Sequence, residues 1–425
     1  MKKLFMALLS ALVLPAWSQT SLSDCQEAAA RNYPLIRKYD LIRQTTAYTV
    51  ANLNKGWLPQ VSALAQATWQ NRVAQLPDAL GGMMTSMGYA PEGLKKDQYK
   101  VGIDVSQTIW DGGRIRNRKQ MENRLGDVQT AEENVTMYAV RRRVNELFFS
   151  VLATDERMKA TDDLLTLLAA NEQKLSAMLR NGVATQSDVD AVKAERMKTM
   201  QQQTELKGVR RAALQMLSLF CGYEVQMLSK PPVAEVAQTV ERPELQLIDR
   251  RIQWTEAAER TLKADLMPRL SVFVQGYYGY PSYNMFDDIM THRWRLNGLI
   301  GARLTWNIAS LYTHKNEQRK LESQRRMAEN SREVFLFNNS IEQVRQRQLM
   351  ETYRQLMADD EEIIRLRGAV RKAAESKLDH GIIDVNQLIQ ELTRENDARN
   401  RRSAHEMEML KALYDLRFAV GEAGN

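Results

Sequence analysis

The sequence is 425 residues long, and its 59 lysines and arginines against 52 aspartates and glutamates give a formal charge of +7 at pH 7. Acidic and basic residues alternate along the helix-forming stretches, which indicates solvated helix faces and not the basic, aromatic-lined stripe typical of nucleic-acid binding. We therefore expect neither DNA nor RNA as a partner.

The first 18 residues have the three-part pattern of a secretory signal peptide. Lys2 and Lys3 precede an apolar run from Leu4 to Leu14, and Ala16-Trp17-Ser18 follows it. The run is too short to span a bilayer, and no later segment has roughly 18 apolar residues in succession. We expect export of the chain, cleavage after Ser18 and no transmembrane helix in the mature protein.

Residues 19–222 are predicted to form a first repeat, which begins with a helix from Pro34 to Trp57 and a strand pair over about 59–113. A helical hairpin over about 114–221 follows. All ten prolines lie outside the intervals 92–230 and 282–425, which favours long uninterrupted helices. The first, over 114–180, would measure about 100 Å at 1.5 Å per residue.

A glycine-containing turn, RNGVATQSD at residues 180–188, joins the two helices of this hairpin. Gly182 can adopt positive φ just past the helix end, and Thr185 or Ser187 can cap the return helix over about 188–220. The sequence LDHGIIDVN at 378–386 offers Gly381 with Asp384 or Asn386 for the same roles. The turn therefore occurs twice.

The rest of the chain repeats the order of the first half. A proline-rich connector over 223–242 leads to a second repeat over 243–425, with a strand pair over about 268–309 and a hairpin over about 310–420. Pro34 and Pro59 align with Pro243 and Pro268 at an offset of 209, and later positions align at an offset of 199. The pattern predicts a tandem duplication.

The four strand segments alternate between apolar and polar residues, as in Val61, Ala63 and Ala65 against Ser62 and Gln66. A sheet packed on a soluble core is the usual interpretation of such strands. Here the helices are already paired with each other and the chain is exported, so we favour an outer-membrane barrel with apolar residues facing lipid. Four strands cannot close a barrel, and lipid does not tolerate open edges, so several protomers must contribute.

Tryptophans mark the ends of these strands. Trp57, Trp110 and Trp306 lie at helix–strand junctions, and Trp294 lies near the opposite ends. We predict that they form the aromatic girdles of a membrane interface.

Two cysteines, Cys25 and Cys221, would be exported with the chain. Cysteines in an oxidising compartment can pair when their Cα atoms lie within about 7 Å, which a sequence does not show. A disulfide and two buried free thiols both remain open.

Taken together, these motifs resemble the TolC family of outer-membrane efflux channels. The local marks are SLSDCQEAAARNYPLI near the mature N-terminus, QTIWDGG at 107–113, RNGVATQSDVDAV and LDHGIIDVNQLIQ at the turns, and LFCG and FAVG closing the halves. The resemblance implies a mainly α fold with a small β part. Long helical hairpins would form a trimeric α-barrel, and four strands per protomer would form a twelve-stranded outer-membrane β-barrel.

The resemblance also implies partners. A homotrimer in outer-membrane lipid, with a long periplasmic extension, would meet a periplasmic adaptor (membrane fusion) protein and an inner-membrane pump of RND or ABC type. Residues at the matching turn positions are implied to contact the adaptor, namely Arg180, Gly182, Val183, Ser187, Gly381, Ile382 and Asn386.

The resemblance further implies a constriction just beyond the turns, ringed by carboxylates that favour cations. Asp188 occupies this position in the first copy, whereas Gln387 and Gln390 stand where the second copy of family members often has aspartate. That departure weakens the expectation of a strongly acidic constriction. Helix capping is the alternative role for Asp188.

No constellation in the sequence supports catalysis, a metal site or a cofactor. The four histidines are scattered, and the chain has no Cys-x-x-Cys, phosphate loop or nucleophile motif. Met83, Met84 and Met87 are interpreted as adaptable apolar residues of an extracellular loop in preference to a copper site. We predict a passive, non-enzymatic exit channel of a tripartite efflux or type I secretion system, with a periplasmic coiled-coil structural or adaptor protein as the alternative.

Overall fold

The computed structural model describes residues 19–237 and 239–422, so the predicted signal peptide lies outside the described residues. Helices dominate, and four strands make up a small β part, which confirms the predicted fold class of the protomer. Along the described chain, no helix has the length and apolar character of a membrane span.

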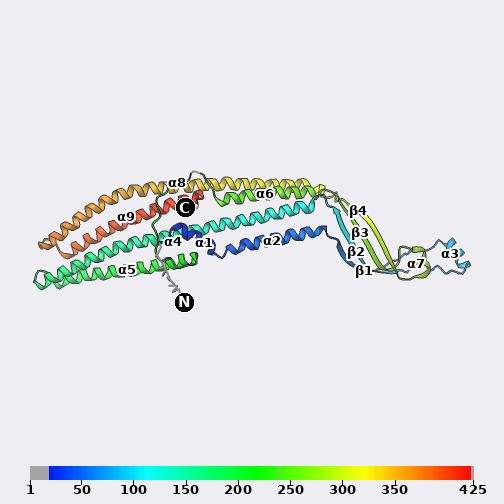
Figure 1. The fold of residues 1–425 in the computed structure, drawn as a ribbon, viewed down its shortest axis with the longest axis horizontal. Coiled ribbons are helices and arrows are strands. Elements are labelled where there is room, and N and C mark those ends of the chain that lie inside the picture. The colour runs from blue at the N-terminus through cyan, green and yellow to red at the C-terminus, as the bar shows by residue number, and fades with distance from the viewer. Residues whose placement is uncertain (1–18, 238, 423–425) are drawn as a thin grey trace, which may run out of the picture. The chain divides into compact units, whose positions relative to one another are not determined.

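Apart from α1 and the short η1, which have no counterpart in the second half, the elements follow one another in the same order in both halves (Figure 1). The first half contains α1 (Leu22–Asn32), α2 (Ile36–Asn54), the short 3-10 helix η1 (Lys55–Trp57), β1 (Gln60–Trp69), α3 (Asp78–Ser86), β2 (Asp97–Trp110), α4 (Arg114–Arg180) and α5 (Gln186–Cys221). The second contains α6 (Pro243–Ala264), β3 (Arg269–Tyr280), α7 (Met285–Thr291), β4 (Arg295–Thr305), α8 (Ser310–Asp379) and α9 (Val385–Val420).

The chain divides into two compact units that do not coincide with the two repeats. The sheet unit comprises Leu41–Thr130 and Ile248–Asn330, and the helical unit comprises the described residues up to 40, Ala131–Leu247 and those from 331 onward. Each unit contains segments of both repeats, because the two repeats contact each other within the sheet and within the helical core.

The sheet unit is built on one antiparallel sheet with the strand order β1-β2-β3-β4. The pairing of β2 with β3 joins the strand pair of the first repeat to that of the second. Both outer strands, β1 and β4, have only one neighbour in the sheet. The sheet therefore ends in two open edges.

The helical unit has two buried apolar clusters. The first gathers side chains from α1, α4, α5 and α9 around Phe148, Leu217 and Leu413. The second lies beneath the two turns and gathers α4, α5, α8 and α9 around Leu168, Leu388 and Leu392. Such burial stabilises a helix by roughly 25 cal/mol per Å² of apolar surface removed from water, so packing and not helix propensity holds these long helices in place.

Candidate functional site

The two turns that close the helical hairpins have matching geometry. Gly182 has φ 73° and Gly381 has φ 69°, a left-handed conformation that glycine adopts without strain. The amides of Val183 and Ile382 bond back to the carbonyls of Met178 and Lys377, both at 2.9 Å, which closes the preceding helix end in each copy. The positive φ predicted for the two glycines just past the helix ends is confirmed.

Each turn presents one exposed apolar side chain at the equivalent position. Val183 and Ile382 are both 69% exposed, while the following residues, Ala184 and Ile383, pack against the cluster beneath. Arg180, Ser187 and Asn386 are exposed beside them. The residues predicted to contact an adaptor therefore lie on the open surface of the two turns.

The residues predicted to line a constriction, Asp188, Gln387 and Gln390, lie within the first two turns of the return helices. Thr185 is the N-cap of α5, and the Asp188 carboxylate accepts hydrogen bonds from the backbone amide of Thr185 at 2.9 Å and from its hydroxyl at 2.7 Å. In the second copy Asp384 caps α9 by accepting from the amide of Gln387 at 2.9 Å. Both carboxylates satisfy orphan donors at a helix start, so each has a capping role in the protomer.

Above the second turn a buried carboxylate links the two helices of the hairpin. The side chain of Glu395 on α9 is only 5% exposed and pairs with Arg371 of α8 and Arg399 of its own helix. Burial pushes the pKa of Glu395 up, but the hydrogen bonds from the two arginines prevail and leave that pKa below its usual value. This network was not predicted from the sequence.

The sheet has one apolar and one polar face, as its register shows. Paired residues share a face, and one row runs across all four strands through Val61, Val105, Val274 and Ile300. The adjacent row on the other face runs through Ser62, Asp104, Gln275 and Leu299. The alternation predicted from the sequence is thus continuous from one open edge to the other.

The predicted girdle residues lie at strand ends and are all exposed by more than a third. Trp294 stands beside Tyr99 and Tyr278, with ring centroids 5.9 Å and 5.6 Å apart. Trp57 ends η1, Trp110 ends β2, and the Trp306 indole donates to the carbonyl of Leu266 at 2.9 Å. Trp294 therefore belongs to an aromatic cluster, whereas the other three mark helix–strand junctions.

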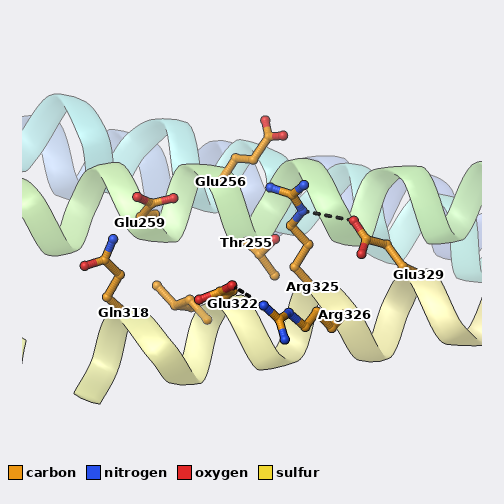
Figure 2. Close-up of a pocket in the computed structure, with 9 residues that line it drawn as sticks. Thr255, Glu256, Glu259, Gln318, Glu322, Arg325, Arg326 and Glu329 are labelled. Atoms are coloured by element: carbon orange, nitrogen blue, oxygen red, sulfur yellow. Dashed lines mark hydrogen bonds and ion pairs between the residues drawn. The ribbon is translucent and has the colours of Figure 1, made fainter. Parts of the chain in front are cut away.

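Two surface grooves accompany these features. One, of about 380 Å³, lies between α6 and α8 in the sheet unit, where Figure 2 shows ion pairs between Arg325 and Glu329 and between Arg326 and Glu322. The other, of about 320 Å³, lies in the helical unit beside Arg371, Glu395 and Arg399. Most of the charged side chains in the two grooves form ion pairs with each other or with a neighbouring residue.

The thiols and the loop methionines complete the inventory of reactive groups. Cys25 and Cys221 are free and buried in the structure, and the Cys221 thiol lies 3.8 Å from the carbonyl oxygen of Cys25. Met83 and Met84 belong to α3, and Met87 follows it. Among the described residues no cluster of three or more histidine, cysteine or acidic side chains is placed to hold a metal ion.

Comparison with known proteins finds one family whose sequence model matches part of the chain. Residues 26–222 match the sequence model of the family described as outer membrane efflux protein. No curated protein sequence matches the chain.

Solved structures share the fold over nearly the whole chain. The outer-membrane channel OprN superposes with a TM-score of 0.67 at 15% identity, covering 94% of this chain and 89% of OprN. The CmeC outer membrane channel of Campylobacter jejuni gives 0.64 at 13% identity, covering 94% of this chain and 85% of CmeC. The MtrE channel of Neisseria gonorrhoeae, in its open state, gives a TM-score of 0.64 at 12% identity, covering 95% of this chain and 89% of MtrE.

Proposed function

We propose that this chain, whose residues 26–222 match the outer membrane efflux protein family, is a member of that family and the exit channel of a tripartite efflux or type I secretion system. The proposed location is the outer membrane, since the matched family is described as outer membrane efflux protein and the fold is shared with solved outer-membrane channels. The finer part of the proposal is that it passively conducts substrates delivered by an inner-membrane pump and a periplasmic adaptor.

The continuous apolar face of the sheet carries this proposal. Ile300 is 77% exposed and Val61 is 67% exposed, at the two ends of the apolar row that crosses the sheet, and Val274 within the row is 48% exposed. A large exposed apolar face marks a surface that is covered by something other than water. Lipid on this face and water on the polar face is the arrangement of an outer-membrane barrel.

The two open edges support a homotrimer. Unpaired N–H and C=O groups at the edges of β1 and β4 would each lack a partner in hydrocarbon, at a cost of several kcal/mol per group. Pairing β4 of one protomer with β1 of the next removes both edges. Three copies supply twelve strands, enough for a barrel with a water-filled interior.

The two turns are the proposed contact with the adaptor. Their equivalent residues Val183 and Ile382 are exposed apolar side chains on a rigid base, since Leu388 and its neighbours fix the helices beneath them. Two equivalent turns per protomer would give a trimer six similar docking points. The alternative function is that of a periplasmic structural or adaptor protein. It does not explain why one face of the sheet is both apolar and exposed.

Electrical recording tests the proposed channel. The purified protein, reconstituted into planar lipid bilayers, is expected to produce discrete conductance steps, because a closed barrel leaves one water-filled path per trimer. A matched preparation with Ile300→Lys, which places a charge on the apolar face, should insert less often. If the unmodified protein inserts and never conducts, the channel proposal is wrong.

A further inference from the structure

The polar face of the sheet carries more positive than negative charge. By register, Lys100 of β2, Arg269 of β3 and Arg303 of β4 lie on this face, and Asp104 is the one carboxylate among its paired strand positions. Arg295 shares the face but pairs with Asp287. Within residues 19–237 and 239–422, no ion pair neutralises Lys100, Arg269 or Arg303, so their charge is available to solutes beside the sheet.

Two of these cations are held against aromatic rings. The guanidinium of Arg303 lies 4.8 Å from the ring centroid of Phe273, and the ammonium of Lys100 lies 5.0 Å from that of Tyr277. Both distances are within the range of a cation–π interaction. Each pair joins β3 to a neighbouring strand, and Phe273 and Tyr277 stand four residues apart on the same face of β3.

A glycine opposite each ring makes the arrangement possible. Gly301 pairs with Phe273, and a Cβ atom at Gly301 would lie 2.8 Å from the ring carbon Cζ. Gly102 pairs with Tyr277, and a Cβ atom there would lie 2.6 Å from the Cβ of Tyr277. The glycines thus leave the space that each aromatic residue occupies close to the sheet.

The aromatic ring also holds each cation beside the sheet without neutralising its charge. An aromatic face attracts a cation through its quadrupole and carries no net charge, so the field of Lys100 and Arg303 still reaches the surrounding water. The Tyr277 hydroxyl donates to the carbonyl of Pro281 at 3.1 Å, which fixes one of the two rings. The same cation, aromatic and glycine combination therefore occurs twice on one face.

The second hairpin turn offers less negative charge than an acidic one would, because Gln387 and Gln390 are neutral. Asp188 and Asp384 are engaged as helix caps, and both glutamines are exposed.

We propose that Lys100 and Arg303, each held on an aromatic ring, make the polar face an anion-selective wall, so that the solutes this channel favours are anionic. The inference rests on the proposed function, because the polar face borders a water-filled path only if the sheet is part of a barrel. It adds a substrate class to that function.

Reversal potentials in a potassium chloride gradient test the inference. At low ionic strength, where the Debye length is about 10 Å or longer, the reconstituted protein is expected to pass chloride in preference to potassium. The double variant Lys100→Gln/Arg303→Gln should lower the chloride-to-potassium permeability ratio roughly two-fold or more, and Asp104→Asn should raise it. High salt should suppress both changes.

The charge-conserving variant Lys100→Arg/Arg303→Lys is the matched control and should keep the selectivity of the unmodified protein. A pore that prefers potassium, or a ratio that does not respond to Lys100→Gln/Arg303→Gln, would overturn the anion-selective wall and leave the channel itself intact. Absence of any conductance would overturn the channel proposal and this inference together.

Discussion

Glu395 shows how one side chain can link two helices near the turns. Its carboxylate receives hydrogen bonds from Arg371 across the hairpin and from Arg399 at 2.8 Å along α9. A buried ion pair adds little net stability compared with apolar packing, but removing one partner leaves uncompensated charge. The α8–α9 contact therefore depends on Glu395 staying ionised.

We predict that Glu395→Gln lowers the free energy of unfolding of the helical unit by about 1.5–3 kcal/mol at neutral pH, the contribution of hydrogen bonds to a charged group. Because the folded-state pKa of Glu395 lies below the ordinary value of 4.5, its contribution is present above that pH and is lost as the pH falls further. Denaturant unfolding at pH 7 and at acid pH, followed by hydrogen exchange in α8 and α9, measures both effects.

Glu362 offers a matched control for this prediction, because its partner Arg365 lies on the same helix and both side chains are more than half exposed. Glu362→Gln should leave the stability of α8 and α9 unchanged. Equal effects of the two substitutions, or a Glu395→Gln difference that persists in acid, would contradict the role given to Glu395.

Residues with a local sequence signal could be predicted, whereas residues whose contacts depend on strand pairing could not. Gly182 and Gly381 could be identified because a helix end followed by glycine has a local signal. The stacking of Arg303 on Phe273 could not be predicted, because it depends on the register between β3 and β4. Asp188 was expected at a constriction, and the structure adds its bonds to Thr185, a capping pattern visible in the sequence as Thr-x-x-Asp.

The long helices are the elements that the sequence determined best. The helix predicted over 114–180 is confirmed by α4, and the return helix predicted over about 188–220 corresponds to α5. Continuous helix-forming residues without proline leave few alternatives to such helices.

Short elements escaped prediction because tertiary contacts select them. α1 is a separate helix, opened by a capping box between Ser21 and Asp24 and packed in the first apolar cluster. α3 contains Met83 and Met84, which were predicted to lie in a loop, and α7 lies within the connection between β3 and β4, where no helix was predicted. Seven to eleven residues make a marginal helix in isolation, so its neighbours decide whether it forms.

Two adjacent residues of β4 test the assignment of the sheet faces. Ile300 lies on the apolar face and Leu299 on the polar face, although both are apolar side chains. We predict that Ile300→Lys destabilises the membrane-inserted state by about 2–4 kcal/mol, whereas Leu299→Lys is tolerated because it meets water. Folding into lipid vesicles, titrated with denaturant, measures the difference. Equal costs for the two substitutions would contradict the assignment.

At the scale of the whole molecule, duplication and assembly are connected. β2 and β3 come from different repeats, so their pairing turns two hairpins into one four-stranded sheet and leaves β1 and β4 at the edges. The same need for partners that joins the repeats within one chain would join neighbouring chains in lipid. The duplication was readable from proline and glycine spacing, whereas the strand order was not, because pairing between distant segments has no local signal.

The number of copies in the membrane-embedded particle tests the account most directly. Native mass spectrometry of the full-length protein, released from detergent micelles, measures the mass of the assembly without requiring a pump, an adaptor or a substrate. The account predicts a species of three copies, since three sheets of four strands close a barrel without open edges. A stable single copy as the detergent-solubilised, folded species would contradict it.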